Sequence, residues 1–224
     1  GTMTVAGTMT VQSAATYALD TRDITVTGTT TSPGTTRIST GTYTASGATD
    51  FSNGTLSITS TGIYDADGTF DAGSGNITFS AAGTLKLANT VTSLGTLSTD
   101  YGTVEYDKAS ADQALYSGSS AETYNNLTIS GASSTKTAPG NITVNGDLTT
   151  ANATSCKLDM GANDLTLKGD LNVGATDGLD LTESSCVFTM SGASAQNITH
   201  AGVTGDGAVV SETGETDLGG FSTS

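Results

Sequence analysis

The sequence is poor in the residues that most often carry chemistry. It has no tryptophan, one histidine, two cysteines and only seven lysine and arginine residues among 224. This leaves little material for a metal centre or for thiol chemistry. With 22 acidic side chains the formal net charge is −15, which repels nucleic acid and anionic lipid. We therefore expect no nucleic-acid binding. We also expect no membrane insertion, because no apolar run is long enough for a transmembrane helix.

Small residues dominate what is present. The chain has 29 glycines among many threonines, serines and asparagines, and its hydrophobic content of 35% is below the globular norm. Such a composition also occurs in disordered chains. Here, however, leucine, isoleucine, valine and phenylalanine recur at every second position, which is typical of β-strands.

A heptapeptide repeat organises the second half of the chain. Ile142–Leu148 (ITVNGDL) is followed by Leu165–Leu171 (LTLKGDL) and, more loosely, by Phe188–Gly192, so the copies begin 23 residues apart. Each copy alternates apolar residues and then reaches a glycine, which indicates a strand, a corner and another strand. A fixed period in this range is typical of a solenoid, whose coils bury their apolar face only when stacked.

The same pattern extends toward the N-terminus with a drifting period. Leu56 and Ile58 return as Ile77 and Phe79, and the later apolar pairs continue at spacings of 19 and 23 residues. These later pairs are Leu85 and Leu87, Val104 and Tyr106, and Leu127 and Ile129. We therefore predict an all-β parallel β-helix (β-solenoid) with about 19–23 residues per turn. A tandem β-sandwich is the alternative, because several Asn-Gly and Asp-Gly pairs suit hairpin turns.

We expect one elongated domain with three regions. Residues 51–202 form the regular solenoid, residues 1–50 an irregular N-terminal cap or inter-subunit strand region, and residues 203–224 a C-terminal cap or docking tail. A chain that starts with Gly1 instead of methionine indicates a processed mature form or an excised fragment.

Both ends of the chain carry candidate self-assembly residues. The N-terminal set forms the first rung or a cap, which we favour, or a strand that pairs with a neighbouring subunit. The C-terminal set would anchor a cap or a docking strand. The residues are Met3, Val5, Met9 and Val11 at the N-terminus, and Val209 and Val210 at the C-terminus.

Two stretches resemble a known group of proteins. Tyr124–Gly131 (YNNLTISG) and Gly140–Leu148 (GNITVNGDL) are similar to modules of large bacterial surface proteins that are predicted to form parallel β-helices. The likeness covers roughly residues 102–200, and residues 1–50 depart from it. The resemblance implies an extracellular or cell-surface setting and a role in adhesion or filament building, and it brings no catalytic residues.

The two cysteines lie in similar motifs. Cys156 and Cys186 each follow a serine and precede an alternating apolar pair, so both sulfurs should point inward. We predict a disulfide between them, since an extracellular setting permits one. Two buried free thiols are the alternative, because a 23-residue turn stacks Cys156 near Leu179 instead of Cys186.

Candidates for metal binding and catalysis are weak. Asp65, Asp67 and Asp71 form a fragment of an acidic calcium loop that lacks its later glutamate, so we predict no metal and no cofactor. His200 ends a strand without an assignable nucleophile. The basic residues are dispersed, with no acid pair at equivalent positions of successive coils. We therefore predict no catalytic residue, and a polysaccharide-degrading enzyme is the least favoured function.

Six asparagines begin Asn-x-Thr sequons and are candidates for glycosylation. Four of them precede an inward-facing residue, so their side chains should point outward. They are Asn53, Asn76, Asn126, Asn141, Asn152 and Asn197.

The predicted architecture suggests a structural function. Every coil of a parallel solenoid pairs with the coils on both sides, but the two end coils keep unpaired strand edges. We expect a secreted subunit of an extracellular filament or surface fibre, whose partners are other copies of itself added head to tail. The alternative is a fragment of a cell-surface adhesin that binds glycans.

Overall fold

The computed structural model describes residues 2–116, 118, 121–174, 178–181, 183, 185–200 and 209–212. The fold is an all-β parallel β-solenoid of about nine turns, with about 21 residues per turn. Every strand pairing among the described residues is parallel, which excludes the tandem sandwich. The chain divides into two compact units, Gly1–Asp107 and Lys108–Ser224, called unit 1 and unit 2 below.

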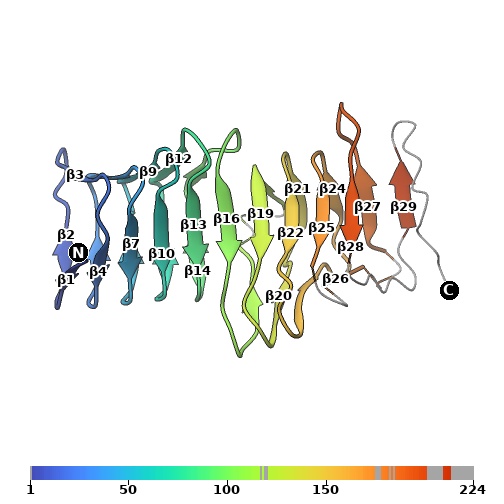
Figure 1. Ribbon diagram of the computed structural model, residues 1–224, viewed down its shortest axis with the longest axis horizontal. Coiled ribbons are helices and arrows are strands. Elements are labelled where there is room, and N and C mark those ends of the chain that lie inside the picture. Colours follow the sequence, from blue (N-terminus) through green and yellow to red (C-terminus); the bar gives the residue numbers. More distant parts are fainter. Residues whose placement is uncertain are drawn as a thin grey trace. The chain divides into compact units, whose positions relative to one another are not determined.

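Three parallel sheets form the walls of unit 1 (Figure 1). The first contains β1 (Met3–Val5), β4 (Ile24–Val26), β7 (Thr42–Ala45), β10 (Ile63–Ala66), β13 (Thr84–Leu87) and β16 (Thr103–Tyr106). The second contains β2 (Met9–Thr10), β5 (Thr30–Thr31), β8 (Thr49–Asp50), β11 (Phe70–Asp71) and β14 (Val91–Ser93). The third contains β3 (Thr16–Leu19), β6 (Thr35–Ile38), β9 (Thr55–Ile58), β12 (Asn76–Phe79) and β15 (Thr96–Leu97). The chain visits the three sheets in turn, one strand in each per coil.

The register confirms the predicted repeat. Leu56 pairs with Ile77 and Ile58 with Phe79, while Leu85 pairs with Val104 one coil further along. All of these side chains are buried. Alternation at period two thus places the same apolar positions above one another in successive coils.

Glycine columns occupy the three corners of unit 1. A Cβ atom on Gly47 would meet the backbone of Gly28, and one on Gly75 would meet that of Gly54. Gly102 also has a positive φ of 76°, which other residues rarely adopt. Two corners therefore pack backbone against backbone, whereas in the third corner most glycines lie against the side chains of Ile38, Ile58 and Phe79. The columns are Gly7, Gly28, Gly47 and Gly68; Gly34, Gly54, Gly75 and Gly95; and Gly41, Gly62, Gly83 and Gly102.

The first fifty residues are not irregular, contrary to the prediction. Strand β1 pairs with β4, and β4 with β7, in the register that continues through unit 1. The sequence pattern is weak here because buried positions hold threonine: Thr30, Thr36 and Thr49 are each at most 2% exposed. An apolar periodicity cannot detect such coils.

Aromatic side chains fill the wider part of the unit 1 core. Tyr43 and Tyr64 stack with ring centroids 4.9 Å apart and planes at 12°. Their hydroxyls stay hydrogen-bonded inside the core, Tyr43 to Thr30 at 2.9 Å and Tyr64 to Thr49 at 3.1 Å. The buried threonines therefore satisfy the polar atoms of the buried tyrosines.

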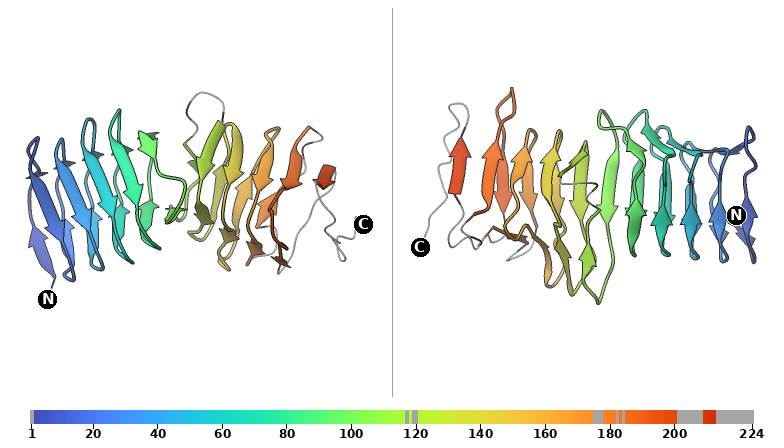
Figure 2. Two further views of the ribbon diagram at one scale, coloured as in Figure 1. Left: turned by 90° about the horizontal axis from the view of Figure 1, so that it is seen from above. Right: turned by 180° about the vertical axis from the view of Figure 1, so that it is seen from behind.

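Unit 2 repeats the three-walled plan (Figure 2). One sheet contains β19 (Asn126–Ile129), β22 (Leu148–Thr150), β25 (Leu171–Val173) and β28 (Ile198–His200). The next contains β17 (Gln113–Ala114), β20 (Ser134–Thr137), β23 (Cys156–Asp159) and β26 (Leu179–Asp180). The last contains β18 (Ala121–Tyr124), β21 (Asn141–Val144), β24 (Leu165–Leu167), β27 (Val187–Met190) and β29 (Val209–Glu212).

The heptapeptide copies align in unit 2 as predicted. Ile142 pairs with Leu165 and Leu165 with Phe188, all in the same sheet. Val209 and Val210 belong to β29, which adds to this sheet by pairing with β27. Their side chains, and residues 203–208 and 213–224 of the predicted tail, lie outside the described residues.

Asparagine and aspartate side chains link the coils of unit 2 at their corners. The Asn126 Oδ1 accepts the backbone N–H of Asp147, and the Asp147 Oδ1 accepts that of Asp170, both at 2.8 Å. The Asp170 Oδ1 accepts the N–H of Asn197 at 2.9 Å. Each side chain thus holds the backbone of the following coil, which fixes the register where a strand begins.

Candidate functional site

The first coil of unit 1 presents a surface that we call the N-terminal face, formed by residues 2–20. Its strands β1, β2 and β3 are each the outermost strand of their sheet. A strand in this position pairs on one side only and leaves alternate backbone groups free on the other. All three walls of the solenoid therefore end in an open edge at the same coil.

The hydrogen bonds show which residues face the open side. The Met3 N–H donates to the Asp23 carbonyl, and the Val5 carbonyl accepts the Thr27 N–H, both at 3.0 Å. Alternate residues of a parallel strand direct their backbone groups to opposite sides, so those of Thr4 point away from β4. By the same argument the backbone groups of Thr10 in β2 and of Ala18 in β3 point outward.

The side chains of the N-terminal face continue the core columns. Met3 stands over buried Ile24 and is itself 50% exposed. Val5, Met9 and Tyr17 are partly exposed at the corresponding core positions, whereas Val11 and Leu19 are buried. The face is thus an apolar cross-section of the core rimmed by threonine and other small residues.

One glycine column also ends open at this face. A Cβ atom on Gly28 would meet the backbone of Gly7, whereas one on Gly7 finds nothing within 4 Å. A further coil in the same register would lie on Gly7 as Gly7 lies on Gly28. Backbone edges, core columns and this corner therefore all match the requirements of another coil.

In unit 2 the strands β26, β28 and β29 are outermost in their sheets. They are the last strands in each sheet, and within the described part of the chain they pair on one side only. The candidates Val209 and Val210 belong to this group through β29. His200 ends β28, and its side chain lies outside the described residues.

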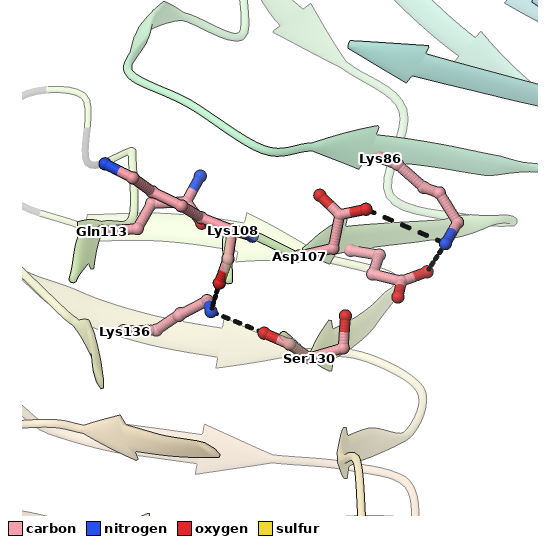
Figure 3. A network of polar contacts seen from close by, with 7 residues as sticks. Lys86, Asp107, Lys108, Gln113, Ser130 and Lys136 are labelled. Carbon is pink, nitrogen blue, oxygen red and sulfur yellow. Dashed lines mark hydrogen bonds and ion pairs between the residues drawn. The ribbon is translucent and has the colours of Figure 1, made fainter. Parts of the chain in front are cut away.

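A charged column crosses the outer face of the first sheet of unit 1. Asp65, Lys86 and Glu105 stand at equivalent positions of three successive strands. The Lys86 Nζ lies 3.2 Å from the Glu105 Oε2 and 3.9 Å from the Asp107 Oδ2 (Figure 3). Asp65 and Glu105 are two coils apart with Lys86 between them, because the coils have 21 and 19 residues. An acid pair at equivalent positions of successive coils does occur in the second sheet, contrary to the prediction, where Asp50 pairs with Asp71.

Burial alters the acid–base properties of this column. It raises the pKa of Asp107 to about 6; Lys86 opposes this shift, and Asp65, Glu105 and Asp67 add to it. Burial and Asp67 also raise the pKa of Asp65. Burial lowers the pKa of Lys86, but its carboxylate neighbours, Glu105 first, outweigh burial and leave it raised. The column therefore holds its protons more strongly than isolated side chains do.

Unit 2 contains a buried lysine that the sequence did not single out. Lys136 is 0% exposed, and its Nζ donates to the carbonyls of Lys108 and Ser130 at 2.5 Å (Figure 3). It also donates to the Ser134 Oγ at 2.7 Å. Lys136 lies two positions after Ser134 in β20, so both side chains point inward. This alternation is the feature of the sequence from which the burial of Lys136 could have been predicted. The ammonium joins segments that are distant in the sequence.

The predicted disulfide is absent. Cys156 and Cys186 are both free and buried. Cys156 begins β23 and pairs with Ser134, whereas Cys186 precedes β27 in a different sheet. Burial raises the pKa of both thiols, with Lys136 opposing the shift at Cys156. The alternative of two buried free thiols therefore describes the structure.

The acidic candidates for calcium are divided between two sheets. Asp65 belongs to β10 and the charged column, while Asp71 belongs to β11 and accepts the Gly73 N–H at 2.8 Å. Asp67 lies in the corner between them. Among the described residues, no group of three histidine, cysteine or acidic side chains has an arrangement that could hold a metal ion.

The sequon asparagines lie at the surface to different degrees. Asn126 is partly exposed and the other five are exposed. The side-chain oxygens of Asn126 and Asn141 accept backbone N–H groups of the following coil, and the Asn53 Oδ1 accepts the Ser74 hydroxyl. Glycosylation at any of the six positions remains a prediction.

The geometry, and not a known relative, carries the functional argument. The described part of the chain contains no helix that is long and apolar enough to cross a membrane. Comparison of the chain with protein-family models, curated proteins and solved structures gave no significant match.

Proposed function

We propose that this chain is a structural subunit of an extracellular filament or surface fibre that grows by stacking one copy on the next. The N-terminal face of one copy would pair with the last strands of another. The observation that carries this proposal is the first coil, where three strand edges, the core columns and the Gly7 corner are all open together. A head-to-tail contact whose rotation does not close into a ring produces an open filament.

The energetics of stacking favour association. A coil added to the N-terminal face would bond the outward backbone groups of Thr4, Thr10 and Ala18, at about 0.5–1.5 kcal/mol for each hydrogen bond. It would also cover Met3 and the partly exposed apolar side chains, at about 25 cal/mol for each Å² buried. Since the strands are already formed, little chain entropy opposes these gains.

Two substitutions would block stacking without disturbing the fold. Gly7→Val places a side chain where nothing lies within 4 Å, but where a stacked coil would pass. Thr4→Pro removes an outward N–H that has no role in pairing with β4. Thr25→Val, on the outer side of β4, is the matched control because it leaves the N-terminal face unchanged.

The test is assembly of the full chain, followed by light scattering and electron microscopy over a range of protein concentrations. The wild type and Thr25→Val should form filaments, whereas Gly7→Val and Thr4→Pro should remain monomeric with unchanged melting temperatures. A wild-type chain that stays monomeric at high concentration, or a Gly7→Val chain that polymerises like the wild type, would contradict the proposal. Binding on a glycan array without assembly would favour the adhesin alternative.

A further inference from the structure

The charged column of unit 1 is unbalanced. Three carboxylates, those of Asp65, Glu105 and Asp107, act on one ammonium, that of Lys86, and the Asp67 carboxylate also acts on Asp107. Lys86 lies closer to Glu105 than to Asp107, at 3.2 Å against 3.9 Å. One ammonium group therefore neutralises several carboxylates on the same outer face, and its ion pair with Asp107 is weaker than its ion pair with Glu105.

Asp107, at the end of β16 beside the column, has a carboxylate oxygen that is cut off from solvent. Its side chain is 20% exposed, and its Oδ1 is buried without a hydrogen-bond partner. Its backbone N–H bonds the Leu87 carbonyl at 3.2 Å, which ties the residue to the end of β13. A carboxylate held in this way is costly when ionised and acceptable when protonated, because a neutral acid needs less solvation.

We propose that the charged column is a proton-sensitive element that stabilises strands β13 and β16 in mildly acidic solution. Uptake of one proton by Asp107 removes a buried negative charge and leaves Lys86 paired with Glu105. At neutral pH the ionised Asp107 carboxylate destabilises the same two strands, because a buried negative charge is then incompletely neutralised. The element depends only on contacts within unit 1 and does not rest on the proposed assembly.

The direction of the effect follows from linkage. The pKa of Asp107 is raised to about 6 in the folded chain, against about 3.9 for an unfolded aspartate. Between these values the folded state binds more protons, so its stability increases as the pH falls through about 6 and decreases as the pH rises. The facing groups are Asp65 on β10, Asp67 in the next corner, Lys86 on β13 and Glu105 on β16.

The two pKa values set the size of the effect. From pH 7 to pH 5, the opening equilibrium of the strands around Asp107 should fall by about tenfold because of this residue alone. Asp107→Asn keeps the shape of the side chain without the titration. The ratio of opening in the wild type to opening in this variant should therefore change about tenfold over the same interval.

Hydrogen exchange followed by mass spectrometry on the full chain measures this ratio. Peptides within residues 84–107 report on the element, and peptides within residues 141–167 in unit 2 serve as an internal reference. Comparing the wild type with Asp107→Asn at each pH cancels the intrinsic pH dependence of exchange. Asp100→Asn, at an exposed turn position, is the matched control and should keep the wild-type ratio at every pH.

A second variant tests the element if Asp107→Asn folds poorly. Asp65→Asn removes a carboxylate that raises the pKa of Asp107, so the pH at which protection increases should shift downward while the effect itself persists. A constant ratio between wild type and Asp107→Asn, or an unshifted midpoint in Asp65→Asn, would overturn the proposal.

Discussion

The buried pair Tyr64 and Thr49 offers a sharp test of how the core of unit 1 tolerates polar atoms. The Tyr64 hydroxyl lies 3.1 Å from the Thr49 Oγ1, and the two residues are 0% and 2% exposed. Tyr64→Phe removes the tyrosine hydroxyl and leaves the Thr49 hydroxyl buried without this partner. Thr49→Val replaces the threonine hydroxyl by a methyl group of similar size and leaves the Tyr64 hydroxyl without its partner.

The expected magnitude follows from burial. Each single substitution should reduce the free energy of unfolding by about 1–3 kcal/mol, because a buried hydroxyl loses its partner. The double variant should cost less than the sum of the two, since apolar groups then replace both partners. We expect a coupling energy of about 1 kcal/mol between the two positions.

Urea unfolding of the full chain measures these energies, and hydrogen exchange of β7 and β10 assigns the transition to unit 1. Thr55→Val, on the outer side of β9, supplies the control cycle with Tyr64→Phe. That cycle should be additive within about 0.5 kcal/mol. Equal additivity in the Tyr64 and Thr49 cycle would refute the idea that buried threonines stabilise the tyrosine stack.

Two further predictions concern the corners and the thiols. Gly47→Ala should lower the melting temperature clearly, because its Cβ would meet the Gly28 backbone, whereas Gly7→Ala should leave the monomer unchanged; equal melting temperatures for the two variants would contradict the corner packing. Cys156 and Cys186 should react with a thiol reagent only after denaturation, because burial raises the pKa of both and limits access. Rapid labelling of the native chain near neutral pH would contradict this expectation.

The regular repeats were readable from the sequence because they depend on local alternation. Ile142, Leu165 and Phe188 pair as their spacing predicted, and so do Leu56 and Ile77. The coils before residue 50 were not predicted to be regular, because threonine replaces apolar residues at buried positions such as Thr30 and Thr49. A polar side chain that finds its partner in another coil is indistinguishable from a surface residue in the sequence.

The candidate sites show the same division. The open first coil was anticipated through Met3, Val5, Met9 and Val11, because an end coil must lack a neighbour on one side. The charged column was not anticipated, although Asp65, Lys86 and Glu105 are plain in the sequence. Their meeting depends on two coils of different length, 21 and 19 residues.

The sequence by itself determined that the chain builds strands, corners and a stacked solenoid, because period two and recurring glycines are local properties. Only the tertiary structure decided which side chains lie above one another. It placed Cys156 in β23 and Cys186 just before β27 of another sheet, and it gathered three acids around Lys86. The physical reason is that vertical neighbours depend on the summed length of three strands and three corners. Corners of different length give coils of 19, 20 and 21 residues, so the spacing in the sequence does not by itself say which residue lies above which.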